Sequence, residues 1–143
     1  MNAVRKIGVL TSGGDAPGMN AAVRSVTRCA LHRGIKVVGI QRGYAGLLAG
    51  DFFEMDLRSV SNIIQNGGTI LYTARCLEFK EDAVQQRAVE ICRENGIDGL
   101  VVIGGDGSFR GAAKLSAKGI PCIGIPGTID NDIAASDYTI GFD

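Results

Sequence analysis

The strongest constraint on the fold is an apolar run that ends in a glycine-containing loop, a pattern that occurs three times. The runs cover residues 6–11, 99–103 and 121–125, and the loops that follow them cover residues 12–18, 104–108 and 126–132. Short, nearly continuous apolar runs are typical of strands buried on both faces of a parallel sheet. Parallel strands need crossover connections, usually helices, so the pattern predicts an α/β fold.

Helical periodicity occupies the segments between these strands. We expect helices over residues 19–33 and 81–95, ended by Gly34 and Gly96, and a third from the 104–108 loop to about residue 118. The apolar stripe expected on the first helix is Ala22, Val26 and Cys29, and on the second Val84, Ala88, Ile91 and Cys92. With a strand expected over residues 36–41, the order predicts a three-layer αβα fold with a mainly parallel, doubly wound (Rossmann-like) sheet.

The segment from residue 42 to residue 73 has a weaker pattern. It suggests a glycine-rich turn at Arg42, Gly43 and Gly46, a strand near residues 52–55 and a short helix before Gly67. The sequence shows no internal repeat, linker or domain boundary. Residues 138–143 carry no signal that ends a domain, so we expect residues 1–143 to be one domain of a longer protein.

Composition excludes several classes of partner. Lys plus Arg equals Asp plus Glu at 15 each, so no net charge attracts the chain to nucleic acid or an anionic membrane. The four cysteines are scattered and there is one histidine, which predicts neither a zinc site nor a disulfide framework. No run is long enough for a membrane span, and residues 7–10 are too short for a signal-peptide core. We therefore expect a cytoplasmic protein that binds any anionic ligand through local contacts.

The first loop, residues 12–18, has glycines whose N–H groups can close on a phosphate, and a helix begins after it. An ordinary glycine-rich turn explains this loop equally simply and is favoured when the loop is taken alone. Gly13 and Gly18 have the spacing of a Walker A motif, but Met19 and Asn20 occupy the positions that require Lys and Ser or Thr. The loop is not a P-loop.

The second and third loops carry carboxylates. Asp106 stands among glycines, where it is either a turn or helix-cap residue or an anchor for a magnesium ion shared with phosphate oxygens. The third loop places Asp130 and Asp132 two positions apart after an apolar strand, which is unusual for a structural turn. A carboxylate there can accept the proton of a hydroxyl that attacks phosphorus.

Together the loops resemble bacterial ATP-dependent 6-phosphofructokinases from residue 4 to the end of the chain. The shared motifs are GGDAPGMNA at residues 13–21, TARC at 73–76, GGDGS at 104–108, PGTIDND at 126–132 and TIGFD at 139–143. Lipid and NAD kinases have segments similar to the second loop, but the third is specific to phosphofructokinases. Family members are more than twice as long, so the resemblance implies that this chain is the ATP-binding domain without the second half.

The resemblance implies roles for individual residues. It implies that ATP contacts Gly14, Arg75, Cys76, Gly105, Asp106, Gly107 and Ser108, and that Asp106 holds Mg²⁺. It implies that Thr128, Ile129 and Asp130 face fructose 6-phosphate, with Asp130 as general base for its 1-hydroxyl and Asp132 supporting the metal and phosphate region. Arg75 would lie between nucleotide and sugar. The implied reaction is the glycolytic transfer of the γ-phosphoryl group of ATP, which gives fructose 1,6-bisphosphate.

The resemblance also bears on specificity and regulation. Pyrophosphate-dependent relatives carry Asp and Lys at the positions of Gly107 and Gly127, so the two glycines imply use of ATP. Arg24 and Arg28 match effector-site arginines that bind ADP or phosphoenolpyruvate, and a homotetramer is implied. Leu77 replaces a proline that is usual in the family, which reduces the rigidity expected of the loop beside Cys76.

Two alternatives remain open. One is that the chain as it stands is a catalytically silent nucleotide-binding or assembly module, because the sugar-binding residues of the family's second half are missing. The other, a lipid or NAD kinase relative, is disfavoured by the loop at residues 126–132 and by the absence of an amphipathic membrane-facing segment.

Overall fold

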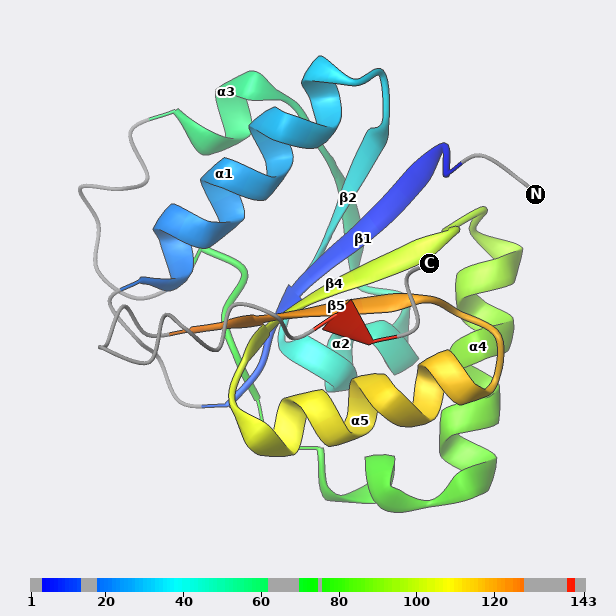
Figure 1. The fold of residues 1–143 in the computed structure, drawn as a ribbon. Helices are drawn as coiled ribbons and strands as arrows, with labels where there is room; N and C mark the ends of the chain where they lie inside the picture. The colour runs from blue at the N-terminus through cyan, green and yellow to red at the C-terminus, as the bar shows by residue number, and fades with distance from the viewer. Residues whose placement is uncertain (1–3, 14–17, 62–69, 75, 128–138, 141–143) are drawn as a thin grey trace.

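The computed structural model describes residues 4–13, 18–61, 70–74, 76–127 and 139–140. In this part of the chain one six-stranded sheet has the order β3-β2-β1-β4-β5-β6 (Figure 1). The strands are β1 (Lys6–Thr11), β2 (Lys36–Ile40), β3 (Phe52–Met55), β4 (Gly99–Gly104), β5 (Cys122–Pro126) and β6 (Thr139–Ile140). The four central strands pair in parallel, whereas β3 and β6 pair antiparallel at the two edges. The mainly parallel sheet predicted from the sequence is confirmed.

Helices cover both faces of the sheet. On one face lie α1 (Met19–His32) and α3 (Leu57–Val60), and on the other lie α2 (Gly43–Ala49), α4 (Asp82–Glu94) and α5 (Asp106–Ala117) (Figure 1). A short 3-10 helix, η2 (Leu77–Lys80), precedes α4. The three-layer αβα arrangement is thus confirmed. None of the helices that the structure describes combines the length and apolar character needed to cross a lipid bilayer.

Alternation along the strands builds a separate core on each face. In β1, Ile7 and Val9 face α1, whereas Leu10 belongs to the cluster under α2, α4 and α5. The same division separates Val101 from Val102 in β4. Successive strand side chains point to opposite faces, so an unbroken apolar run supplies both cores at once.

The buried face of α1 differs from the stripe expected from the sequence. Its buried residues are Met19, Asn20, Val23, Thr27 and Ala30. Ala22 and Val26 are half-buried beside this face, and Cys29 is exposed. The expectation was wrong by about one position because Thr27, a polar residue, occupies the centre of the face.

The turn predicted at Arg42, Gly43 and Gly46 is confirmed only at Arg42, which precedes α2 with φ of +61°. It was wrong for Gly43 and Gly46, which lie within α2. A Cβ atom at Gly46 would lie 1.4 Å from the carbonyl oxygen of Gln41, so the helix can pack here only with glycine. Gly43 has φ of +59° and its Cβ would approach the Thr11 carbonyl at 3.0 Å. These glycines therefore serve close packing against β1 and the end of β2.

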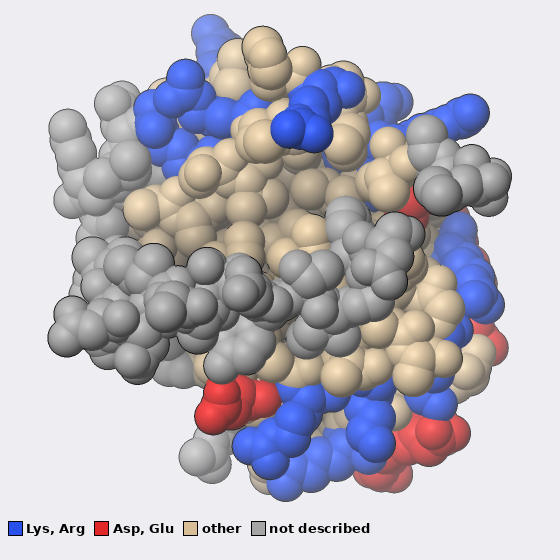
Figure 2. Space-filling view, in the orientation of Figure 1, with Lys and Arg blue, Asp and Glu red and all other residues tan. Residues whose placement is uncertain are grey.

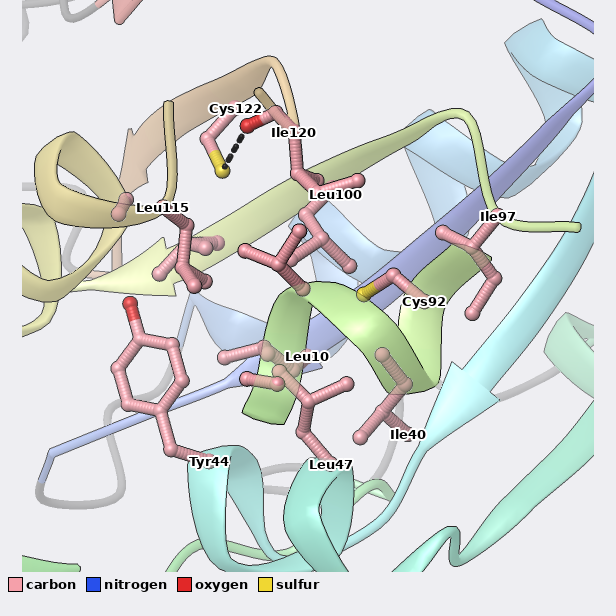
Figure 3. Close-up of a cluster of buried hydrophobic side chains, with 14 of the residues drawn as sticks. Leu10, Ile40, Tyr44, Leu47, Cys92, Ile97, Leu100, Leu115, Ile120 and Cys122 are labelled. Carbon is pink, nitrogen blue, oxygen red and sulfur yellow. Dashed lines mark hydrogen bonds between the residues drawn. The ribbon is translucent and has the colours of Figure 1, made fainter. Parts of the chain in front are cut away.

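Two thiols lie in the core between the sheet and helices α4 and α5, Cys92 on α4 and Cys122 on β5 (Figure 3). Cys92 and Cys122 are fully buried, and the Cys122 thiol donates to the carbonyl of Ile120 at 3.3 Å. Burial raises the pKa of each thiol from its ordinary value of 9.0 to about 12. For Cys92 the neighbouring Cys122 adds to the rise, whereas the hydrogen bond with Ser116 opposes it for Cys122. Both side chains therefore stay neutral in the folded chain.

We expect this burial to make the fold sensitive to alkaline pH. Above pH 9.0 the thiols ionise in the unfolded chain but keep their protons in the folded chain until about pH 12. The unfolded state then binds fewer protons, so each thiol lowers the free energy of unfolding by about 1.4 kcal/mol per pH unit in this window. Urea unfolding between pH 7.5 and 10.5 measures the slope.

Cys122→Ala should flatten that slope, although it also removes packing at every pH. Cys29→Ala, at an exposed thiol, is the matched control and should leave the slope as in the unmodified chain. A slope that is identical for both variants would contradict the assignment to buried thiols.

Candidate functional site

The three glycine-containing loops begin side by side at the carboxyl edge of the sheet. Their strands β1, β4 and β5 are neighbours. The Ser12 N–H donates to the Ile103 carbonyl at 2.8 Å, and the Gly127 N–H donates to the Gly104 carbonyl at 2.9 Å. These two bonds extend the ladder past the strands and hold the starts of all three loops together. Ligands bind at this edge in open parallel α/β sheets.

A cleft of about 1180 Å³ opens at this edge. Small-molecule sites commonly measure about 300–1,000 Å³, so the cleft is large enough for a nucleotide. Its described lining comes from the loops after β1, β4 and β5, from α1, α2, η2, α4 and α5, and from residues 73, 74 and 76. These residues are Ser12, Gly13, Met19, Tyr44, Thr73, Ala74, Cys76, Phe79, Lys80, Gln85, Gly104, Gly105, Asp106, Gly107, Ser108, Arg110, Gly111, Lys114 and Gly127.

Glycine at the end of β4 lets two loops approach each other. A Cβ atom at Gly104 would lie 2.5 Å from the Ser12 carbonyl oxygen and 2.6 Å from Ser108 Oγ. Any side chain there would push the first loop away from α5. Next in sequence, Gly105 and Gly107 have open space where a Cβ would stand. Backbone at the start of α5 is therefore accessible from the cleft.

The start of α5 is suited to an anion. The helix has 12 residues and its first turn lies in the cleft wall, so unpaired N–H groups and the positive end of the helix dipole face that space. Phosphate groups bind at helix N-termini for this reason. The glycines of the second loop leave these groups uncovered.

Asp106 is the first residue of α5, is exposed, and lies in the cleft wall. Neither of the two salt bridges between described residues involves it. The described residues contain no group of three or more His, Cys, Asp or Glu side chains that could hold a metal ion. A single carboxylate beside a helix N-terminus fits Mg²⁺ that arrives with a phosphate, because Mg²⁺ is usually bound through one or two carboxylates together with phosphates and water.

Two aromatic residues of the cleft were not anticipated from the sequence. Tyr44 of α2 and Phe79 of η2 stack with their ring centroids 4.0 Å apart and an interplanar angle of 12°. The Tyr44 hydroxyl donates to the Ser108 carbonyl at 2.5 Å. Burial raises the Tyr44 pKa far above its ordinary value, and Cys122 adds to the rise. The hydroxyl therefore remains a donor that ties α2 to the first turn of α5.

The cleft is locally basic although the chain carries no net charge. Lys80, Arg110 and Lys114 line it, against Asp106 as the one carboxylate among the described lining residues. None of these cations forms a salt bridge within the described part of the chain. Figure 2 shows Lys and Arg side chains gathered over α5 and, separately, over α1. Lys80, Arg110 and Lys114 therefore supply local attraction for an anion, although the whole chain has no net charge.

Cys76 lies at the edge of the cleft, half-buried, with its sulfur 4.0 Å from a Glu78 carboxylate oxygen. Burial and the nearby Glu78 charge raise the pKa of its thiol, and a hydrogen bond from the Phe79 N–H opposes the rise. The next residue, Leu77, is 70% exposed, so its side chain does not form part of the cleft floor.

The structure brings together five of the residues predicted to bind ATP: Cys76, Gly105, Asp106, Gly107 and Ser108. The other predicted site residues, Gly14, Arg75, Thr128, Ile129, Asp130 and Asp132, lie outside the described residues. Arg24, half-buried, and Arg28, exposed, belong to α1 and do not line the cleft. Their role as effector ligands stays a prediction, as do the roles of the cleft residues.

Sequence comparison places this chain beside known proteins. The family model described as phosphofructokinase matches residues 6–143. The chain is 64% identical to ATP-dependent 6-phosphofructokinase 1 of Clostridium perfringens and 67% identical to ATP-dependent 6-phosphofructokinase of Halothermothrix orenii. Each match covers 98% of this chain but only 44% and 42% of those proteins. The chain thus spans less than half the length of these curated relatives.

Solved structures give the same result for the fold. The phosphofructokinase of Pichia pastoris superposes with a TM-score of 0.85 at 42% identity, covering 99% of this chain and 17% of that one. A pyrophosphate-dependent phosphofructokinase from Nitrosospira multiformis shares the fold, with a TM-score of 0.79 at 21% identity over 90% of this chain and 35% of that one. With the family model matched along nearly the whole chain, this chain belongs to the phosphofructokinase family.

Proposed function

We propose that this chain is the ATP-binding domain of an ATP-dependent 6-phosphofructokinase and binds the magnesium complex of ATP in the cleft at the carboxyl edge of its sheet. The observation that carries the proposal is the meeting of three loops beside Asp106. The starts of the loops are held together there because the Ser12 N–H donates to the Ile103 carbonyl and the Gly127 N–H donates to the Gly104 carbonyl. The first turn of α5 lines the same cleft.

The cleft favours a particular orientation of the nucleotide. Its loop end offers backbone N–H groups and Asp106, which suit phosphates and their metal ion. Its other end, formed by η2, α4 and the middle of α5, offers Phe79, Gln85 and Gly111, which suit a flat base. Mg²⁺, when bound with ATP, would neutralise part of the phosphate charge.

In the whole protein the same edge would supply the chemistry of phosphoryl transfer. Asp130 would accept the proton of the 1-hydroxyl of fructose 6-phosphate, and Arg75 would stabilise charge on the transferred group. Thr128 and Ile129 would contact the sugar phosphate, and Asp132 would support the metal region. Gly127, at the start of the third loop, donates its N–H to the Gly104 carbonyl at the end of β4 and lines the cleft, so the loop begins beside the proposed nucleotide site.

Binding of ATP with and without magnesium tests the proposal directly. In isothermal titration calorimetry, we expect Mg²⁺ to strengthen ATP binding to the unmodified chain. Asp106→Asn should weaken binding of the magnesium complex about tenfold, equivalent to about 1.4 kcal/mol. Metal-free ATP should bind the variant at least as tightly as the unmodified chain, because a carboxylate that repels phosphate is gone.

Glu90→Gln is the matched control, since Glu90 is an exposed carboxylate on α4 outside the cleft. It should leave both affinities unchanged. Failure of the unmodified chain to bind ATP at all would refute the proposed function.

A catalytically silent nucleotide-binding module is the second candidate, favoured by the chain's span of only 44% of its Clostridium perfringens relative. A coupled assay with ATP and fructose 6-phosphate separates the two, because turnover by the 143-residue chain alone would refute silence. We also propose a cytoplasmic location and a homotetrameric whole protein with an effector site at Arg24 and Arg28. The four free cysteines support the location.

A further inference from the structure

The end of the cleft away from the glycine loops contains one buried polar side chain, Gln85. It lies in the first turns of α4, is 4% exposed, and lines the cleft together with Phe79 and Gly111. A buried amide needs partners for both its nitrogen and its oxygen. Its surroundings therefore show which ligand groups this end of the cleft can accept.

The orientation of the Gln85 amide is fixed by one contact. Nε2 donates to the Phe79 carbonyl oxygen at 2.9 Å. A carbonyl oxygen only accepts hydrogen bonds, so the amide must present its NH₂ group to it. The flipped amide would bring two oxygens together, which excludes that assignment on chemical grounds. Oε1 is consequently directed away from Phe79.

Within the described residues Oε1 has no hydrogen-bond partner, since the Gln85 side chain makes only the Nε2 bond. Oε1 is nevertheless not fully enclosed by protein atoms. Among the described residues, the one fully enclosed side-chain oxygen or nitrogen without a hydrogen-bond partner is Thr27 Oγ1. The accessible space bordered by Gln85 is the cleft. An acceptor with no partner in the described protein is therefore available to a ligand.

The surrounding surface suits a flat ring with a donor on its edge. The Phe79 ring stacks on Tyr44, and Gly111 presents backbone because a Cβ there would come within 3.0 Å of the Tyr44 hydroxyl oxygen. Among purines, adenine carries an amino donor at position 6, whereas hypoxanthine and guanine carry an oxygen acceptor there. A hydrogen-bond acceptor on the protein can accept from the 6-amino group of adenine. The same acceptor would repel the 6-oxo oxygen of hypoxanthine or guanine.

We propose that Gln85 Oε1 accepts a hydrogen bond from the 6-amino group of adenine and selects ATP over 6-oxopurine nucleotides. This inference rests on the proposed function, because it assigns the base of the same bound nucleotide. Gln85 is then a specificity-determining residue of the cleft, positioned by the Phe79 carbonyl.

Competitive binding of ATP and ITP to the full chain tests the inference. The two bases differ at position 6 and in the N1 proton that accompanies the oxo group. We expect the unmodified chain to bind ITP about tenfold more weakly than ATP, the effect of about one hydrogen bond. Gln85→Met keeps the length of the side chain but removes the acceptor, and should bring the ratio of the two dissociation constants to within about threefold.

Gln85→Lys gives the reciprocal test. Its ammonium group can still donate to the Phe79 carbonyl but offers only donors to the base, so the preference should shift toward ITP. Gln86→Lys is the matched control, because Gln86 is the exposed neighbour on α4 and gains the same charge. It should keep the ratio of the unmodified chain, whatever it does to the two separate affinities. Circular dichroism verifies that each variant is folded.

The outcomes separate the two proposals. If the unmodified chain binds ATP but binds ITP equally well, the inference on Gln85 is overturned and the proposed function stands. The same holds if folded Gln85→Met keeps the original ratio. If ATP does not bind the unmodified chain, both proposals are overturned together.

Discussion

Replacing Asp130 by serine should lower turnover by about 10²–10⁴-fold in an active full-length protein that contains this chain. The physical reason is loss of the proton acceptor for the attacking sugar hydroxyl. An ordinary aspartate with a pKa of about 3.9 is a weak base, but it is sufficient when the transition state is loose and the proton leaves late. Steady-state kinetics with a coupled assay measures turnover.

Affinity for ATP distinguishes this role from general damage to the site. Asp130→Ser should leave the dissociation constant of ATP nearly unchanged, because the predicted contact is with the sugar. Asp137→Ser removes another carboxylate from the segment after β5, one without a predicted role, and serves as the control. A loss of turnover below about tenfold for Asp130→Ser would remove Asp130 from its proposed role.

The second large effect is expected from Gly107→Asp, which should weaken ATP binding by about 10²–10³-fold. A carboxylate about 4 Å from a phosphate charge costs about 4 kcal/mol at an effective dielectric constant of about 20. Sterically the substitution is allowed, since no atom lies within 4 Å of a Cβ built at Gly107. An acidic residue in the first turn of α5 also suits the helix dipole, so the variant should remain folded.

Gly107→Asn separates charge from size. Asparagine has nearly the shape of aspartate but no charge, and it should weaken ATP binding by about tenfold or less. Calorimetric titration of both variants with ATP provides the comparison. Equal losses for Asp and Asn would show that crowding rather than repulsion acts at this position, and unchanged ATP binding by Gly107→Asp would refute a phosphate site beside α5.

Elements with a strong local signal were predicted well. The strands that became β1, β4 and β5 are short, nearly continuous apolar runs. Helix α4 was expected over residues 81–95 and observed at Asp82–Glu94. Gly34 and Gly96, expected to end helices, have φ values of +78° and +70°. Each of these features depends on neighbours in the chain, so periodicity and turn chemistry are sufficient to find it.

Elements that depend on distant contacts were predicted poorly. Gly43 and Gly46 indicate a turn by local preference, yet they form α2 because its backbone packs directly on other backbone. Thr27 and Gln85 look like surface residues in sequence but are buried. Polar residues give no local sign of burial, and only the packing of α1 and α4 on the sheet reveals it.

The sequence by itself determined the α/β class, the identity of the three loops and, through their motifs, the family. These are properties of short segments, and order along the chain is enough to establish them. Only the tertiary structure decided which residues share the cleft: Tyr44 and Phe79 are 35 positions apart in sequence yet stack at 4.0 Å, and Gln85 faces the same space. Such proximity arises when α2, η2 and α4 pack on one face of the sheet, and no local pattern encodes which side chains then meet.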